Sequence, residues 1–222
     1  MTSLTTFVLP PSLGEEHPGR VAFWRFRHEH YSKRLGFEPL NENELEMDEH
    51  EPASTTITVV EAGDVVAGCR LISSYTAANP LPIEFKYRGA IERPTYEISR
   101  TIIDPQKSCR ELSAILYREI FKALAEQKIE AAYAVVEPKY LRVLQHFYSP
   151  RAFIALGEPR EISTPGGKRL THLPMQICME EWALCWLRPA HVGADAKRHS
   201  TFENASALSP WQVQRPTNHA VA

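Results

Sequence analysis

The stretch STTITVVEAGDVVAGCRLISS, Ser54–Ser74, contains two runs of β-branched and apolar residues that flank Ala62-Gly63-Asp64. Two such runs around a short turn containing glycine and aspartate are typical of a β-hairpin. The other elements that the sequence predicts lie before and after this hairpin in the chain. The hairpin is therefore the natural starting point for deriving the fold.

On the N-terminal side, an uneven apolar stripe predicts a helix over Arg20–Leu35, which Gly36 ends. On the C-terminal side, TYEISRTIID predicts a strand that ends at Asp104-Pro105. Ser108 and Glu111 form a capping box for a long amphipathic helix. Beyond it we predict a buried strand in EAAYAVVE, a helix from Pro138 to His146, and strands in RAFIALG and HLPMQICM, while PLPIEFKYRGAIERP is predicted as a loop with a short strand.

This order of elements predicts an α/β sandwich around a mixed sheet, an architecture that by itself names no function. We expect residues 1–19 to be an N-terminal leader, 20–188 the folded domain and 189–222 a disordered tail. The formal net charge of −2 argues against nucleic acid as a partner. We expect a cytoplasmic protein, because no secretory signal, membrane-spanning run or paired cysteine motif is visible.

The segment ELEMDEHEPAS, which precedes the hairpin, places five carboxylates in eight residues, Glu44–Glu51. Such a segment is either a solvated loop or one that faces cations from elsewhere in the chain. Arginines lie on the elements around it, at Arg27, Arg34, Arg70 and Arg100. A guanidinium matches a carboxylate as a rigid fork, so these arginines are candidates for holding the loop in place.

The order and spacing of these residues resemble the acyl-homoserine lactone synthases, the LuxI-type autoinducer synthases, over roughly residues 20–160. Where the family usually has Phe, Trp and Asp, this chain has Tyr31, Phe37 and Glu51. Related N-acyl amino acid synthases share much of the pattern. The residues that carry the resemblance are Arg27, Tyr31 and Phe37, then Glu46, Asp48 and Glu51 in EMDEHE, then Arg70-Leu71, Phe85, and Glu97–Arg100 in EISR.

The resemblance implies the GNAT fold, a three-layer sandwich with a central mixed sheet. In such folds the strand at Thr95–Ile103 diverges from the parallel strand at Ala131–Val136, and a pantetheine arm lies in the gap. Glu97 and Arg100 are three residues apart, so on a regular strand they face opposite sides. Both reach one site only if a β-bulge intervenes, which would also free a backbone N–H for the oxyanion of a thioester.

The implied activity is transfer of a fatty acyl group from acyl carrier protein, or acyl-CoA, to the amine of S-adenosylmethionine, giving an N-acyl-homoserine lactone. The alternatives are an N-acyl amino acid synthase, another long-chain N-acyltransferase of the GNAT superfamily, or a catalytically silent binding module. Glu97 is the expected general base, with Asp48 second, and Arg100 completes the catalytic set. Substrate-binding residues are expected to be Arg27, Tyr31, Phe37, Glu46, Glu51, Arg70 and Phe85.

We expect no metal and no cofactor besides the two substrates. His28 and His30 are two apart on a helix and point to different faces, which disfavours a shared ion. The turn DPQKSCRE lacks the glycines that bind a pyrophosphate, which favours carrier protein as the donor. Basic residues that suit an acidic carrier protein are Lys139, Arg142, Arg151 and Arg160, and an acyl tunnel would be lined by AAYAVVE, Phe147, Phe153 and Ile154.

Overall fold

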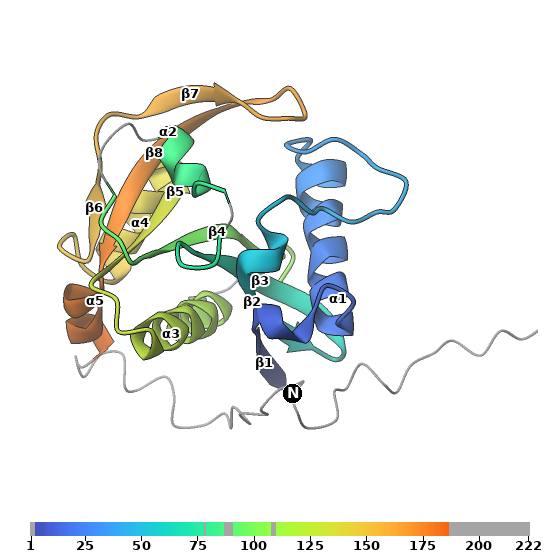
Figure 1. Cartoon of the computed structure of the whole chain (residues 1–222), viewed down its shortest axis with the longest axis horizontal. Helices are drawn as coiled ribbons and strands as arrows, with labels where there is room; N and C mark the ends of the chain where they lie inside the picture. Colours follow the sequence, from blue (N-terminus) through green and yellow to red (C-terminus); the bar gives the residue numbers. More distant parts are fainter. Residues whose placement is uncertain (1–2, 78, 87–90, 108–109, 187–222) are drawn as a thin grey trace, which may run out of the picture.

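The computed structural model describes residues 3–77, 79–86, 91–107 and 110–186 (Figure 1). Its strands form a mixed sheet in the order β1-β2-β3-β4-β5-β8-β6, with β7 paired to β8. The strands are β1 (Leu4–Leu9), β2 (Ser54–Glu61), β3 (Asp64–Ser73), β4 (Tyr96–Ile103), β5 (Ala131–Val136), β6 (Phe153–Ala155), β7 (Arg160–Ser163) and β8 (Arg169–Cys178). The α-helices are α1 (Pro18–Arg27), α2 (Pro82–Lys86), α3 (Arg110–Glu126), α4 (Pro138–Phe147) and α5 (Met179–Trp186).

The predicted hairpin is present as β2 and β3. The two strands pair antiparallel, from Glu61 opposite Asp64 beside the turn to Ser54 opposite Ile72. Both turn residues, Ala62 and Gly63, have positive φ, at 53° and 94°. This backbone twist matches that of the two strands and favours a tight connection. The hairpin and β4 form the part of the sheet against which the site is built.

Helices cover both faces of the sheet (Figure 1). On one face, Phe23 of α1 packs so closely over β3 that Gly68 leaves room for no side chain. On the other face, Cys69 and Leu71 of β3 join Leu116 of α3 in the main hydrophobic core. Alternate residues of β3 thus face α1 and α3, as the pleat of a strand requires.

The parallel pair β4 and β5 diverges, as the family resemblance implied. The two strands are paired only over Tyr96–Ile98 and Ala132–Ala134. Both continue beyond this point, β4 to Ile103 and β5 to Val136. The gap between them therefore opens toward their carboxyl ends, where an extended ligand can add to the strand edges.

A β-bulge interrupts β4 at the edge of this gap. Arg70 of β3 pairs with Ser99, and Gly68 pairs with Ile102, so Arg100 and Thr101 together oppose Cys69 alone. Arg100 has a positive φ of 53°, as the first residue of such a bulge often has. The bulge that would bring Glu97 and Arg100 to one face is confirmed.

Several elements differ from the expectations. The segment expected to be a leader contains β1, which pairs with β2 along its whole length. In the segment 80–94, where a short strand was expected, Pro82 opens the helix α2, and 91–94 form no strand, while 87–90 lie outside the described residues. Strand β7 and helix α5 were not expected, and the first helix continues past α1 as a π-helix, His28–Arg34. The capping residue Ser108 and the expected tail lie outside the described residues.

The close approach of α1 to β3 generates a prediction. A Cβ atom at Gly68 would lie 2.5 Å from a ring carbon of Phe23 and 2.7 Å from the backbone oxygen of Ile57. Because the backbone atom has little freedom to move, we expect Gly68→Ala to lower the free energy of unfolding by about 1–3 kcal/mol. Urea denaturation measures this, with Ala155→Ser on the exposed β6 as the control. Equal stability of the two variants would contradict the contact.

Candidate active site

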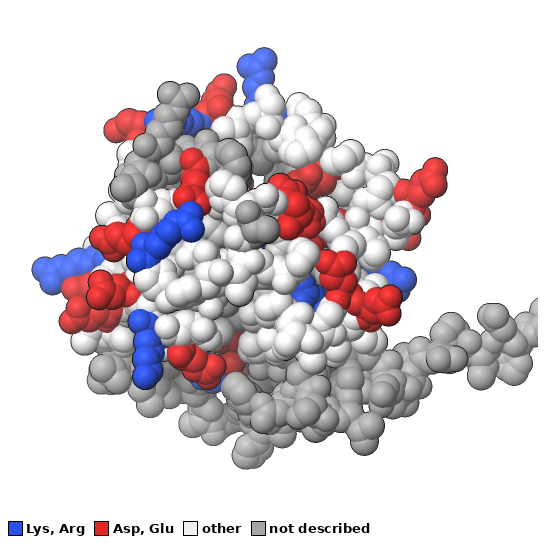
Figure 2. Space-filling model, viewed as in Figure 1, with Lys and Arg blue, Asp and Glu red and all other residues white. Residues whose placement is uncertain are grey.

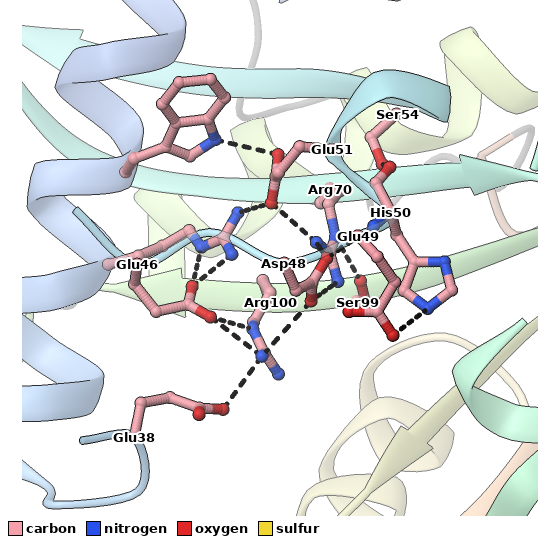
Figure 3. Close-up of polar contacts among 12 residues, drawn as sticks. Glu38, Glu46, Asp48, Glu49, His50, Glu51, Ser54, Arg70, Ser99 and Arg100 are labelled. Atoms are coloured by element: carbon pink, nitrogen blue, oxygen red, sulfur yellow. Dashed lines mark hydrogen bonds and ion pairs between the residues drawn. The ribbon is translucent and has the colours of Figure 1, made fainter. Parts of the chain in front are cut away.

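The acidic segment before the hairpin faces the arginines of the neighbouring elements and is not simply a solvated loop (Figure 3). Arg27 of α1 is the first of them. Its guanidinium donates to Glu46, and its NH1 lies 2.7 Å from Oε1 of Glu51. Trp24, one turn earlier on α1, donates its indole N–H to the other Glu51 oxygen at 2.9 Å. Helix α1 therefore holds both ends of the acidic segment.

Arg70 of β3 makes the second set of contacts. Its guanidinium donates to both carboxylate oxygens of Asp48, with NH2 2.9 Å from Oδ2. Its NH1 also donates to Glu51 at 2.7 Å, and its Nε donates to Oγ of Ser99 at 3.0 Å. A bidentate guanidinium–carboxylate pair fixes orientation as well as position. Asp48 is thereby held above the sheet beside β4.

Arg100, at the bulge of β4, makes the third set. Its Nε donates to Glu46 at 3.0 Å and its NH2 donates to Glu38 at 2.9 Å. The same NH2 lies 3.6 Å from Asp48. In Figure 3, Arg100 lies between Glu46, Asp48 and Glu38. The predicted convergence of Arg27, Arg70 and Arg100 on Glu46 and Asp48 is confirmed.

Burial divides this cluster into two parts. The side chains of Arg27, Arg70 and Glu51 are at most 1% exposed, so that part is sealed inside the protein. Asp48 and Arg100 keep side-chain exposures of 21% and 26%. The outer part is therefore where a ligand reaches the charges.

The electrostatic setting of Asp48 makes it a weak base. Burial favours the neutral carboxyl, but the hydrogen bonds and charge of Arg70 outweigh burial and hold the pKa of Asp48 well below its usual range. The pKa of Glu46 is lowered in the same way, against burial, by Arg27 and Arg100. Both groups stay ionised at neutral pH and hold their protons poorly.

Glu97 lies two residues before Ser99 on β4, so the two side chains share one face of the strand. Its side chain is buried, and Oε2 accepts the backbone N–H of Ile83 at 2.8 Å. Ile83 lies in the first turn of α2, so this short helix positions the carboxylate. The role of Glu97 as a base stays a prediction, and the structure places it beside the gap between β4 and β5.

The predicted wall residues have different environments. The hydroxyl of Tyr31 donates to the carbonyl of Thr101 in the bulge at 3.1 Å, and its ring faces Arg100 at 5.7 Å. Phe37 lies beside Tyr31, with ring centroids 6.3 Å apart. Tyr31 and Phe37 therefore border the outer part of the cluster. The side chain of Phe85 lies outside the described residues.

The residues suggested for an acyl tunnel are not gathered in one place. Phe153 is fully buried against Trp182 of α5, whereas Phe147 and Ile154 are exposed at the surface. The prediction that Phe147 and Ile154 line an acyl tunnel is therefore not supported. The basic residues Lys139, Arg142, Arg151 and Arg160 are all exposed.

No group of three or more potential ligands positioned for a metal ion occurs among the described residues. The described helices also include none long and apolar enough to cross a bilayer. On the face shown in Figure 2, acidic and basic side chains of the described residues are interspersed.

Three residues of the cluster were missed in the sequence. Arg20 donates to the backbone oxygen of Glu51 at 2.6 Å, and Trp24 binds its carboxylate. Glu38 contacts Arg100 from the loop after the π-helix. The only sequence signal for Glu38 is its position directly after Phe37.

Comparisons with known proteins identify relatives of this chain. No family model matches the chain. An acyl-homoserine-lactone synthase of Aeromonas hydrophila is 27% identical over 150 residues, covering 61% of this chain and 72% of that protein. Its counterpart from Aeromonas salmonicida is 26% identical over the same lengths.

Solved structures show the same fold. The CoA-dependent acyl-homoserine lactone synthase BjaI, with SAM and isopentyl-CoA, superposes with a TM-score of 0.67 at 15% identity, over 92% of this chain and 95% of that one. The synthase LasI gives 0.63 at 14% identity, over 81% and 91%. An acyl-CoA N-acyltransferase from Pseudomonas aeruginosa gives 0.56 at 14% identity, over 79% and 100%.

The fold and the diverging strands thus match those of a GNAT-like acyl-CoA N-acyltransferase. Within that class, the chain is an enzyme related to the acyl-homoserine lactone synthases.

The depressed pKa of Asp48 generates a prediction about stability and pH. Between the folded and unfolded pKa values the unfolded chain binds the extra proton, so the stability that Asp48 contributes is present above about pH 4 and is lost as pH falls. We expect Asp48→Asn to cost about 1–3 kcal/mol at pH 7, because Arg70 loses a charged partner. The difference from wild type should shrink toward pH 3 in urea denaturation. A difference independent of pH would contradict the ion pair.

Proposed function

We propose that this enzyme transfers an acyl group from a thioester to the α-amine of S-adenosylmethionine and forms an N-acyl-homoserine lactone. The observation that carries the proposal is the position of Arg100. This residue belongs both to the bulge of β4 at the acyl-donor gap and to the charged cluster that suits an amino-acid acceptor. Donor and acceptor sites therefore meet at one residue.

The donor site is the gap between β4 and β5. Beyond Ile98 and Ala134 the facing edges of the two strands no longer pair with each other. A pantetheine arm contains amide groups, so it adds to these edges as an extra strand would. The thioester then lies near the bulge at Arg100 and Thr101, where a backbone N–H displaced from the regular ladder is placed to bind the oxyanion.

The acceptor reacts as a free amine. The ammonium first loses a proton to a base, and the nitrogen lone pair then attacks the thioester carbon. The C–N bond forms, the C–S bond breaks, and the thiolate leaves with a proton from the new amide nitrogen. Asp48 is a poor base, because Arg70 holds its pKa well below the usual range, and Glu97 is therefore proposed as the base.

Lactone formation follows within the acylated product. An oxygen of its carboxylate attacks the carbon γ to the carboxyl group, and the bond from that carbon to the sulfonium breaks. Methylthioadenosine leaves as a neutral molecule, and charge is conserved because a carboxylate and a sulfonium are both consumed. Arg100 is placed to orient the carboxylate, since it is the most exposed arginine of the Glu46–Asp48–Glu51 cluster.

The donor is proposed to be acyl carrier protein. The turn between β4 and α3 lacks the glycines with which GNAT enzymes bind the CoA pyrophosphate. Lys139 and Arg142 of α4 and Arg151 after it are exposed, and α4 begins directly after β5 at the gap. An acidic carrier protein docked there delivers its pantetheine arm into the gap.

We expect the purified protein to release methylthioadenosine and an acylated lactone from S-adenosylmethionine and acyl carrier proteins of several chain lengths. Glu97→Gln should lower kcat by about 10²–10⁴-fold with little change in KM for S-adenosylmethionine. Glu49→Gln is the matched control, because Glu49 is exposed and, within the part of the chain that the structure describes, its carboxylate pairs with His50 alone, at 3.7 Å. Acylated free amino acids as products would favour an N-acyl amino acid synthase, and no turnover with any donor would contradict the proposal.

The choice of donor has its own test. We expect the double variant Lys139→Glu, Arg142→Glu to raise KM for acyl carrier protein at least tenfold, because like charges then face each other. The KM for a matching acyl-CoA should change by less than twofold. Arg25→Glu on the exposed side of α1 is the control. Equal effects on both donors would contradict docking at α4.

A further inference from the structure

We propose that the Glu38–Arg100 ion pair is the subsite for the amino-acid end of the acceptor, with Glu38 binding the α-ammonium and Arg100 the carboxylate. The inference deepens the proposed function, because it concerns the same acceptor. It adds a residue, Glu38, for which the sequence pattern gave no role.

Each carboxylate of the acidic loop in this cluster lies within 4 Å of at least two guanidinium groups. Glu46 binds both Arg27 and Arg100, and Asp48 binds Arg70 and lies 3.6 Å from Arg100. Glu51 has Arg27 and Arg70 as well as Trp24. Displacing any of these carboxylates would leave a buried guanidinium without part of its compensation.

Glu38 is bound differently. Among the described residues its carboxylate has one polar contact, in which Nη2 of Arg100 donates to Oε1 at 2.9 Å. The other oxygen, Oε2, has no hydrogen-bond partner among the described residues, yet it is not sealed from solvent. Glu38 can therefore receive a cation without breaking a second interaction.

Solvent reaches the Glu38–Arg100 pair. Glu38 and Arg100 have side-chain exposures of 16% and 26%, and Asp48, which Arg70 binds through both oxygens, has 21%, whereas Glu46 has 5% and Glu51 none. In Figure 3, Glu38 comes from the loop at the outer end of the cluster and points toward Arg100. The pair thus belongs to the outer part of the network, which solvent reaches.

Glu38 also balances the charges of the cluster. Arg20, Arg27, Arg70 and Arg100 face Glu46, Asp48 and Glu51, so without Glu38 the cluster has one guanidinium in excess. A site with an excess positive charge repels a cationic acceptor. Glu38 makes the cluster neutral and supplies the carboxylate that faces outward.

The pair is also chemically complementary to an amino acid. An α-amino acid carries an ammonium and a carboxylate a few ångströms apart, the opposite charges to those that Glu38 and Arg100 present. Insertion of such a zwitterion separates the pair but gives each member a new partner of the correct sign. Arg100 meanwhile keeps Glu46, and its bulge position is unchanged.

The protonation behaviour of Glu38 is consistent with this. Burial raises its pKa, and Glu46 and Asp48 raise it further, while Arg100 and Arg27 oppose the shift. Its negative charge is therefore poorly solvated in the free enzyme. A bound ammonium would relieve that cost.

The experiment compares ligands with and without the amino-acid end, and S-adenosylhomocysteine, which keeps that end but has no sulfonium charge, is measured beside S-adenosylmethionine and methylthioadenosine. S-adenosylmethionine carries the amino-acid end, and methylthioadenosine lacks it. By isothermal calorimetry we expect Glu38→Gln to weaken S-adenosylmethionine binding tenfold or more and to change methylthioadenosine binding less than twofold. Glu38→Gln should weaken binding of S-adenosylhomocysteine as much as that of S-adenosylmethionine. Glu38→Asp should recover part of the loss. Glu42→Gln, an exposed carboxylate on the same loop, should bind both ligands as the wild type does.

The outcomes separate this inference from the proposed function. Unchanged S-adenosylmethionine binding by Glu38→Gln, or equal loss of both ligands, would overturn the subsite, while lactone synthesis by the wild type would still support the reaction. Binding of methionine, but not of S-adenosylmethionine, in a Glu38-dependent way would support the subsite and overturn the proposed acceptor. If the wild type bound neither amino acid, both would fail.

Discussion

The structure depends on the mutual neutralisation of buried acids and guanidiniums. Glu51 is sealed from solvent, and the guanidinium groups of Arg27 and Arg70 both lie 2.7 Å from its Oε1. Removing one member of such a buried set leaves an uncompensated charge, which costs several kcal/mol. The set therefore ties together α1, the acidic loop and β3, which are far apart in the sequence. The outer residues Arg100 and Asp48 are in turn held by contacts to buried members of the set, Glu46 and Arg70.

The same network determines the geometry of the reaction site through the bulge. A residue with positive φ is strained unless its surroundings hold it, and Arg100 is held by Glu46 and Glu38. The bulge in turn lies where β4 leaves β5. Charge pairing on one side of the sheet thereby fixes the backbone beside the gap that receives the donor.

The sequence predicted the parts that local pattern determines. The hairpin and β4 followed from turn chemistry and strand pattern, and the convergence of Arg27, Arg70 and Arg100 was implied by the resemblance to the acyl-homoserine lactone synthases. Other parts depend on tertiary contacts that no local pattern encodes: β1 is stabilised by pairing along β2, and the helix α2 is too short to show a period. Glu38 was missed for the same reason, because a single carboxylate on a loop has meaning only once Arg100 is beside it.

The departures from the usual family residues also follow from the contacts. Glu51 is fully buried and reaches Arg27, Arg70 and Trp24, so its longer side chain serves the interior of the network and not the ligand. Tyr31 has a hydroxyl where Phe is usual, and that hydroxyl donates to the carbonyl of Thr101 within the bulge. A buried carbonyl that gains a donor is satisfied and loses freedom to move. The substitution therefore stabilises the bulge instead of altering the chemistry, and recognition of the acceptor is left to the exposed residues around Arg100.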